Sequence, residues 1–357
     1  MFGSCIDHRM TTMATDVPGI PRHRHQVVKH PSPVQRLLSL MNHAAEQPGH
    51  VIHSIWLFTY SDLKTIIATS FGFGLLTSLG AASFGIDPAP AWSICFQRVP
   101  LVLLWAWLNL LPFTIDNQRQ PDAVMEDSIN KPWRTMPSKR MTPDHAQVVM
   151  YIFYALALGT SIRVGGLAQC ITLIGLGFWY NDARGADASC IVRNLINGLG
   201  FMCYTSGAVQ LELHPSQWQF FIRPNGLGLP WLAIIGLIVF TTVHTQDLYD
   251  QAGDSARGRK TLPLVIGDAS ARWVTAAFML FWGIVSPCYW GWLQTGQSGV
   301  LFWSGACMAT LACIIAGRTL TLRSVPADKI TFLLWNLWLV SQYALPLCAG
   351  LGRAGGV

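Results

Sequence analysis

Long apolar stretches recur along the chain from about residue 50 onward and are separated by short polar segments. A helix needs about 20 mainly apolar residues to cross the roughly 30 Å hydrocarbon core of a bilayer. The third and fourth stretches are separated only by residues 163–166, which predicts a tight helical hairpin. The pattern predicts an all-α, polytopic membrane protein with nine transmembrane helices, at approximately residues 55–82, 92–114, 146–163, 165–180, 190–210, 228–246, 272–293, 299–317 and 331–351.

The composition of the 357-residue chain agrees with this pattern. Only 12% of the residues are charged and 51% are hydrophobic, whereas about a quarter of a soluble domain is charged. The low charge together with 15 Trp and 17 Phe also excludes a disordered chain, a coiled coil and a disulfide-built mini-protein. The nine Cys are scattered without a C-x-x-C pair and are expected to be small apolar residues inside helices.

The first 50 residues are polar and lack the apolar core of a cleavable signal peptide. We expect them to form a cytosolic tail, followed by a transmembrane catalytic domain over residues 51–357. Within the tail, residues 33–46 carry Leu37, Leu38, Leu40 and Met41 beside Arg36. This spacing favours a short amphipathic helix on the bilayer surface, and a loosely packed cap helix is an equal alternative.

The positions of the basic residues give an orientation. If nine helices follow a cytosolic N-terminus, 19 of the 24 Lys and Arg fall on the cytosolic side, four fall on the opposite side, and Lys64 lies inside the first span. Cytosolic loops of membrane proteins carry such an excess of Lys and Arg. We therefore expect a multi-pass protein, in the endoplasmic reticulum membrane, with its N-terminus in the cytosol. No dense basic run suits a nucleic-acid partner, and no protein partner can be identified.

Acidic residues gather in two segments, directly after the second and sixth spans, both on the predicted cytosolic side. Asp122 and Glu126 are four residues apart, so they share a helical face, and the second segment repeats this arrangement over two turns. The two segments lie four spans apart, which suggests an internal repeat of four helices with the ninth helix extra. Seven of the 18 acids lie in these segments: Asp116, Asp122, Glu126, Asp127, Asp247, Asp250 and Asp254.

Like charges on one helical face repel each other unless a multivalent cation lies between them. Mg²⁺ prefers one or two carboxylates, and substrate phosphates supply further oxygens. Two acidic faces, each followed by bases, therefore predict a site for a diphosphate held through Mg²⁺. Lys131, Arg134, Arg257 and Lys260 are expected to bind the phosphate oxygens and to offset the charge of a departing diphosphate.

The motifs resemble those of the UbiA superfamily of intramembrane prenyltransferases, from about residue 52 to the end of the chain. Asp247-x-x-Asp250-x-x-x-Asp254, followed by Gly258 and Thr261-Leu262-Pro263, is similar to the second aspartate-rich motif of that family. The resemblance implies nine transmembrane helices around a central cavity, and an isoprenoid diphosphate bound with Mg²⁺ under two cytosolic motifs.

The first motif departs from the family's usual N-D-x-x-D-x-x-x-D. It reads Asn117-Gln118, then Asp122, then Glu126-Asp127-x-x-Asn130-Lys131-Pro132-Trp133-Arg134. This variant is similar to a fungal branch that includes membrane-bound terpene cyclases. The resemblance implies conversion of farnesyl diphosphate to a cyclic sesquiterpene, with loss of diphosphate, in secondary metabolism. The alternatives are transfer of the prenyl group to an aromatic or other acceptor, and a polytopic transporter, for which Asp62 and Lys64 are the only charges well inside a span.

The resemblance assigns roles to individual residues. Trp179 to Asp182 match a loop that caps the diphosphate in the family, and Arg193-Asn194 lie on the same side; aromatic belting and helix-end hydrogen bonding are equal alternatives there. The implied magnesium ligands are Asn117, Glu126, Asp127, Asp247, Asp250 and Asp254, and Asp122 joins them as a catalytic residue. The implied diphosphate-binding residues are Asn130, Lys131, Arg134, Tyr180, Arg257 and Lys260.

An allylic carbocation must be kept from water, and aromatic faces stabilise its charge. A cavity inside the bundle would serve both needs. Most aromatic side chains of a membrane protein face lipid or the interface, so no single residue is assigned to this role. The candidates are Trp56, Phe58, Tyr60, Phe71, Phe73, Trp105, Trp107 and Tyr154.

Overall fold

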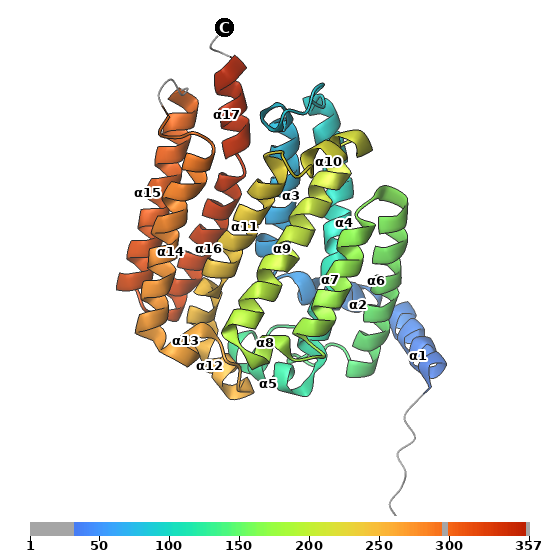
Figure 1. The fold of residues 1–357 in the computed structure, drawn as a ribbon. Coiled ribbons are helices and arrows are strands. Elements are labelled where there is room, and N and C mark those ends of the chain that lie inside the picture. The colour runs from blue at the N-terminus through green and yellow to red at the C-terminus, as the bar shows by residue number, and fades with distance from the viewer. Residues whose placement is uncertain (1–31, 295–298, 355–357) are drawn as a thin grey trace, which may run out of the picture.

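The computed structural model describes residues 32–294 and 299–354. Long helices lie side by side in one bundle, and the short helices α5, α8, α12 and α13 gather at one end of it (Figure 1). The helices of the first part of the chain are α1 (Pro33–Glu46), α2 (Pro48–Thr59), α3 (Ala68–Leu79), α4 (Trp92–Arg119), α5 (Pro121–Asn130), α6 (Pro143–Val164), α7 (Leu167–Tyr180), α8 (Gly185–Ala188), α9 (Cys190–Glu212) and α10 (Pro215–Phe221). Those of the second part are α11 (Gly228–Thr242), α12 (Asp247–Arg257), α13 (Leu262–Ile266), α14 (Asp268–Tyr289), α15 (Gly299–Thr321), α16 (Val325–Gln342) and α17 (Leu345–Ala354).

Six helices are long and apolar enough to cross a membrane, judged by length and composition within the described ranges. This confirms an all-helical, polytopic membrane protein. Of the other predicted spans, two coincide with the shorter apolar segments Leu63–Leu79 and Leu167–Tyr180, and the third coincides with α9. The six are Trp92–Arg119, Pro143–Val164, Gly228–Arg257, Asp268–Tyr289, Gly299–Thr321 and Val325–Leu351.

The first predicted span is not one continuous helix. Helix α2 ends at Thr59, a turn follows, and a π-helical segment, η1 (Leu63–Ile67), leads into α3. The turn contains Ser61 and Asp62, whose side chains contact the guanidinium of Arg134. Ser61 and Asp62, whose side chains bind Arg134, thus interrupt a stretch that the hydrophobic pattern predicts to be one continuous helix.

The predicted hairpin between α6 and α7 is present. Helix α6 ends at Val164 and α7 begins at Leu167, so only two residues connect them. Gly165 and Gly166 have φ values of +106° and +79°, a region that favours glycine. A Cβ at Gly166 would also lie 2.9 Å from the indole of Trp105, so glycine is required by packing as well.

The predicted amphipathic helix over residues 33–46 is α1. Leu40 is buried, whereas Leu38 and Met41 are exposed. The Nη1 atom of Arg36 lies 3.2 Å from a carboxylate oxygen of Asp144 on α6, so the helix also packs on the bundle. Its contact with a bilayer remains a prediction, and the tail before residue 32 lies outside the described residues.

Candidate active site

The two acidic segments lie against each other as the helices α5 and α12. The side chain of Asn130 joins them: its Nδ2 donates to the Asp250 carbonyl at 2.9 Å, and its Oδ1 accepts from the Gly253 N–H at 3.1 Å. A Cβ at Gly253 would lie 2.3 Å from Asn130 Nδ2 and 2.7 Å from the Glu126 carbonyl oxygen. Glycine at residue 253 therefore permits this close approach.

Bases neutralise the acids of both helices. Asp127 accepts two hydrogen bonds from Arg134, at 2.9 and 3.1 Å, and Glu126 contacts Arg257 at 3.1 Å and Arg259 at 3.0 Å. The Nη1 atom of Arg134 binds both oxygens of Asp127, and hydrogen bonds between ionised partners are stronger than those between neutral ones. Three of the four predicted diphosphate-binding bases, Lys131, Arg134 and Arg257, thus contact carboxylates in this structure. Other pairs include Arg193 with Asp247 at 2.5 Å and Lys131 with Asp250 at 2.8 Å.

The Lys131–Asp250 pair crosses from the loop after α5 to α12. Burial disfavours the charged form of Lys131, but the carboxylates of Asp250 and Asp127, together with the hydrogen bond to Asp250, outweigh this effect, so the pKa of Lys131 lies above its usual value. The side chain therefore keeps its positive charge at neutral pH. A fixed positive charge at this position suits a phosphate oxygen.

A cavity with about 710 Å³ of empty space, including open solvent, lies between α5, α12, the C-terminal ends of α4 and α7 and the N-terminal half of α9; we call it the headgroup chamber. The predicted residues that do not line it are Asp122, Asp127, Asn130, Asp247, Asp254, Arg257 and Lys260, of which Lys260 is exposed. The predicted residues that line it are Asn117, Glu126, Lys131, Arg134, Tyr180 and Asp250.

Arg259 also lines the headgroup chamber, although the sequence analysis did not select it. Gly258 has a φ of +77° and ends α12, and the chain turns back so that the Arg259 N–H donates to the Asp254 carbonyl at 2.9 Å. The Arg259 side chain then reaches Glu126 and lies 3.3 Å from Asn117 Oδ1. The signal was Gly258 after the last helical residue, a common helix-ending arrangement. Arg193, singled out on the same side of the membrane, is in the lining too.

A second, apolar cavity with about 610 Å³ of empty space, including open solvent, lies next to the headgroup chamber; we call it the apolar chamber. It lies between α4, α6, α7 and α9. Tyr180 is at the C-terminal end of α7, while Leu173 on that helix and Tyr204 on α9 lie further from the headgroup chamber. The residues that line both chambers are Ile66, Phe113, Tyr180, Asn197 and Phe201.

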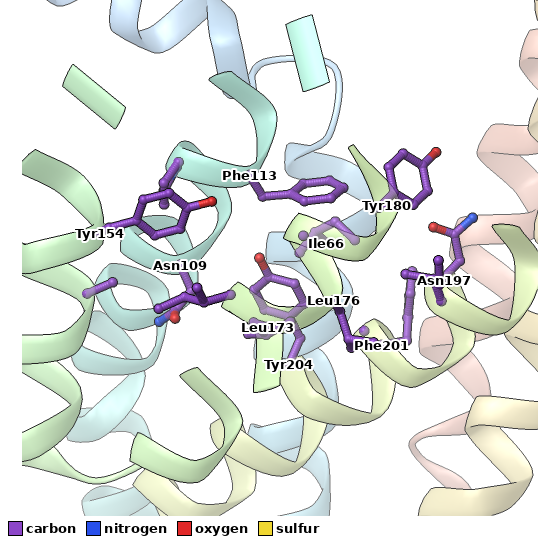
Figure 2. Close-up of a pocket in the computed structure, with 16 residues that line it drawn as sticks. Ile66, Asn109, Phe113, Tyr154, Leu173, Leu176, Tyr180, Asn197, Phe201 and Tyr204 are labelled. Carbon is purple, nitrogen blue, oxygen red and sulfur yellow. The ribbon is translucent and has the colours of Figure 1, made fainter. Parts of the chain in front are cut away.

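Five aromatic rings surround the apolar chamber: Phe113, Tyr154, Tyr180, Phe201 and Tyr204 (Figure 2). Of the eight candidate aromatics chosen from the sequence, only Tyr154 is among them, so the other seven candidates were wrong for this chamber. Trp56 and Tyr60 are exposed on the outside of the bundle, and Phe58, Phe73 and Trp105 are buried in packing between helices. Phe71 and Trp107 are also absent from the lining.

The donor atoms of the site include several oxygens that could bind a metal ion. In residues 32–294 and 299–354, no three His, Cys, Asp or Glu side chains are grouped so that they could hold a metal. However, Oδ2 of Asp254 is buried and has no hydrogen-bond partner among the described residues. Asn117, Glu126 and Asp250 supply further oxygens to the headgroup chamber. Oxygen donors of this kind suit Mg²⁺. The oxygens that are now paired with bases become available to the ion when those bases bind an added anion instead.

Residues 115–338 match the model of the UbiA prenyltransferase family, and the chain belongs to this family. It is 26% identical over 324 residues to fumagillin beta-trans-bergamotene synthase of Aspergillus fumigatus, across 88% of this chain and 97% of that protein. It is 24% identical over 254 residues to a diterpene cyclase of Hericium erinaceus, across 70% and 77%. A solved UbiA homologue from Archaeoglobus fulgidus, bound to DMAPP and Mg²⁺, shares the fold with a TM-score of 0.51 at 12% identity, across 80% of this chain and 98% of that one.

The fold and the family define a class of protein: a polytopic membrane enzyme that acts on prenyl diphosphates. The resemblance drawn from the two acidic motifs is thereby confirmed. The transporter alternative is set aside, because the acidic helices belong to an enzyme family.

Proposed function

We propose that this enzyme is a terpene cyclase that converts farnesyl diphosphate to a cyclic sesquiterpene with loss of diphosphate. The observation that carries the proposal is that the two chambers are adjacent and share five lining residues. A charged chamber suits the diphosphate, and an aromatic, apolar chamber directly below it suits the prenyl chain. The synthase from Aspergillus fumigatus and the diterpene cyclase from Hericium erinaceus, both similar to this chain, support cyclisation by their names.

Ionisation breaks the C1–O bond, and both electrons leave on the diphosphate. Lys131, Arg193 and Arg259 line the headgroup chamber and stabilise the charge that develops on the leaving group. Because Lys131 and Arg193 are paired with Asp250 and Asp247, they are already oriented before the substrate arrives. In a low-dielectric site, such preorganised charges are worth more than in water.

Ring closure then takes place in the apolar chamber. The distal double bond of the farnesyl chain attacks the cation, and loss of a proton completes the hydrocarbon. The faces of Phe113, Phe201 and Tyr204 stabilise the migrating positive charge and keep water away from it. The chamber lining is mostly apolar, which favours release of a hydrocarbon over capture of the cation by water.

Magnesium is the proposed cofactor, and one solved homologue holds Mg²⁺ with a prenyl diphosphate. Bound Mg²⁺ would neutralise charge on the diphosphate as a Lewis acid. We also propose that the chain crosses the membrane nine times and that its N-terminus and active site face the cytosol. The proposed membrane is that of the endoplasmic reticulum. The residues proposed to hold the metal are Asn117, Glu126, Asp127, Asp247, Asp250 and Asp254.

The test supplies microsomes with prenyl diphosphates of several lengths, with Mg²⁺ and without any acceptor. We expect farnesyl diphosphate alone to give a cyclic hydrocarbon that gas chromatography with mass spectrometry detects. A chelator should stop its formation, and added Mg²⁺ should restore it. If only hydrolysis appears, or nothing until an aromatic acceptor is supplied, the enzyme is a prenyltransferase and the cyclase proposal is wrong.

A further inference from the structure

A third cavity opens beside the headgroup chamber, between the turn after α2, the end of α5, and helices α12 and α16; we call it the vestibule. It contains about 1120 Å³ of empty space, including open solvent. Five residues line both the vestibule and the headgroup chamber, so the two cavities are adjacent. These are Asp62, Thr65, Lys131, Arg134 and Gln246.

Basic side chains outnumber acidic ones in the lining of the vestibule. Four cations line it against the single carboxylate of Asp62. Two of these cations, Lys131 and Arg134, also belong to the headgroup chamber, whereas Lys64 and Lys329 belong to the vestibule alone. A concave surface lined by charge of one sign concentrates ions of the opposite sign.

Lys64 and Lys329 are held over aromatic rings. The Nζ atom of Lys64 lies 5.6 Å from the ring centre of Phe332, and that of Lys329 lies 6.0 Å from the ring centre of Tyr249. Neither lysine forms an ion pair with a carboxylate in the part of the chain that the structure describes. Both are exposed, and their donors remain available to an anion in the vestibule.

Asp62 lies at the junction of the two cavities. Its Oδ2 is 3.4 Å from Nη2 of Arg134, which also binds Asp127. An anion that passes from the headgroup chamber to the vestibule therefore competes with Asp62 for Arg134. The carboxylate weakens anion binding at the junction, while the two lysines beyond it strengthen binding.

We propose that the vestibule, through Lys64 and Lys329, binds the released diphosphate on its way to the cytosol. This inference rests on the proposed function, in which diphosphate is the leaving group. The two products differ in chemistry: the hydrocarbon partitions into lipid, whereas the anion needs a charged path to water. The vestibule supplies that path.

Titration of purified protein with inorganic diphosphate, at fixed free Mg²⁺ and followed by calorimetry, tests the vestibule without any turnover. We expect K64Q combined with K329Q to weaken binding roughly threefold to tenfold, since each exposed charge contributes modestly. D62N should tighten binding. Replacement of both lysines by Arg should preserve it, and the exposed Arg323→Gln should leave it unchanged.

Inhibition of turnover by added diphosphate should weaken in the double Gln variant and strengthen in D62N. It should stay unchanged in the double Arg variant and in Arg323→Gln. The proposal is overturned if the double Gln variant binds diphosphate as the natural protein does, or if Arg323→Gln weakens binding equally. If no prenyl diphosphate is consumed at all, the cyclase proposal fails, while the calorimetric comparison of the variants still decides the vestibule.

Discussion

The two parts of the bundle use their large side chains differently. Helices α4, α6, α7 and α9 surround the apolar chamber with aromatic rings. Helices α11, α14, α15 and α16 instead bury Trp231, Trp335 and Trp338 in a continuous core. The indole of Trp335 donates to Thr242 Oγ1 at 2.9 Å, and that of Trp338 donates to the Met308 carbonyl at 3.1 Å. The first part leaves Phe and Tyr rings facing a cavity, whereas the second part packs Trp side chains into its core.

The two regions also differ in the surroundings of a buried ion pair. Arg193 on α9 holds Asp247 on α12, so this pair joins the two parts at the headgroup chamber. Arg272 on α14 holds Asp328 on α16 at 2.7 Å, within the second part. The first pair faces a cavity through Arg193, whereas the second lies in the packed region. We therefore expect one pair to matter for chemistry and the other for stability.

The largest expected effect is the loss of a carboxylate that lines the headgroup chamber. Glu126→Gln and Asp250→Asn keep the side-chain volume and should each lower turnover at least about 100-fold, because they remove charge from the site. The matched variant in the second part is Asp328→Asn. It should lower the thermal unfolding temperature and leave turnover per folded molecule unchanged. Equal kinetic losses in all three variants would erase the distinction between the regions.

A methyl group between the two acidic helices should have the next largest effect. Gly253→Ala places Cβ against Asn130 and the Glu126 carbonyl, which pushes α5 away from α12. Turnover should fall roughly tenfold to 100-fold, since small displacements of catalytic groups are costly. Gly283→Ala is the control, because its Cβ would lie 2.6 Å from Cβ of Ala312, between α14 and α15. That variant should lose about 1–3 kcal/mol of stability without a kinetic change. Unchanged kinetics in Gly253→Ala would contradict the account.

Replacement of one phenylalanine that lines the apolar chamber, and of one in the packed core, should separate product control from packing. Phe201→Leu removes a ring from the apolar chamber and should change the ratio of hydrocarbon products, because the cation loses a stabilising face. Phe73→Leu removes a fully buried ring that packs against Tyr343. It should cost about 1 kcal/mol of stability and leave the product ratio as it is. Gas chromatography of the products and thermal unfolding measure both effects, and a changed ratio in Phe73→Leu alone would reverse the assignment.

The smallest effect is expected for Asp122, at the rim of the first motif. Its carboxylate lies 2.8 Å from exposed Arg184 and does not line the headgroup chamber. Exposed pairs contribute about 0–1 kcal/mol. Asp122→Asn should therefore reduce turnover by less than about threefold, unlike Glu126→Gln four residues later. A loss as large as that of Glu126→Gln would instead support the catalytic role that the sequence predicts for Asp122.

Much of the fold follows from local sequence. Apolar stretches predicted the long helices, and the spacing of Asp122 and Glu126 predicted an acidic helical face, which is α5. The break after α2 was missed, because it depends on Arg134, more than 70 residues away, binding Ser61 and Asp62. A local pattern carries no information about such a distant partner.

The residues that line the apolar chamber could not be predicted from the sequence either. Helical periodicity shows which residues share a face, but in a membrane an apolar face can meet lipid, another helix or a cavity. The ring centres of Trp105 and Tyr204 lie 6.4 Å apart, yet only Tyr204 lines the apolar chamber. The acidic motifs were found because charge near a membrane is costly and therefore informative.

A structure with a non-hydrolysable farnesyl thiodiphosphate and Mg²⁺, determined by electron cryo-microscopy, tests the central claim most directly. The account predicts the thiodiphosphate between α5 and α12, in contact with Lys131 and Arg259, and the farnesyl chain beside Phe113, Phe201 and Tyr204. A farnesyl chain bound among α11, α14, α15 and α16, or a headgroup away from the acidic helices, would contradict it.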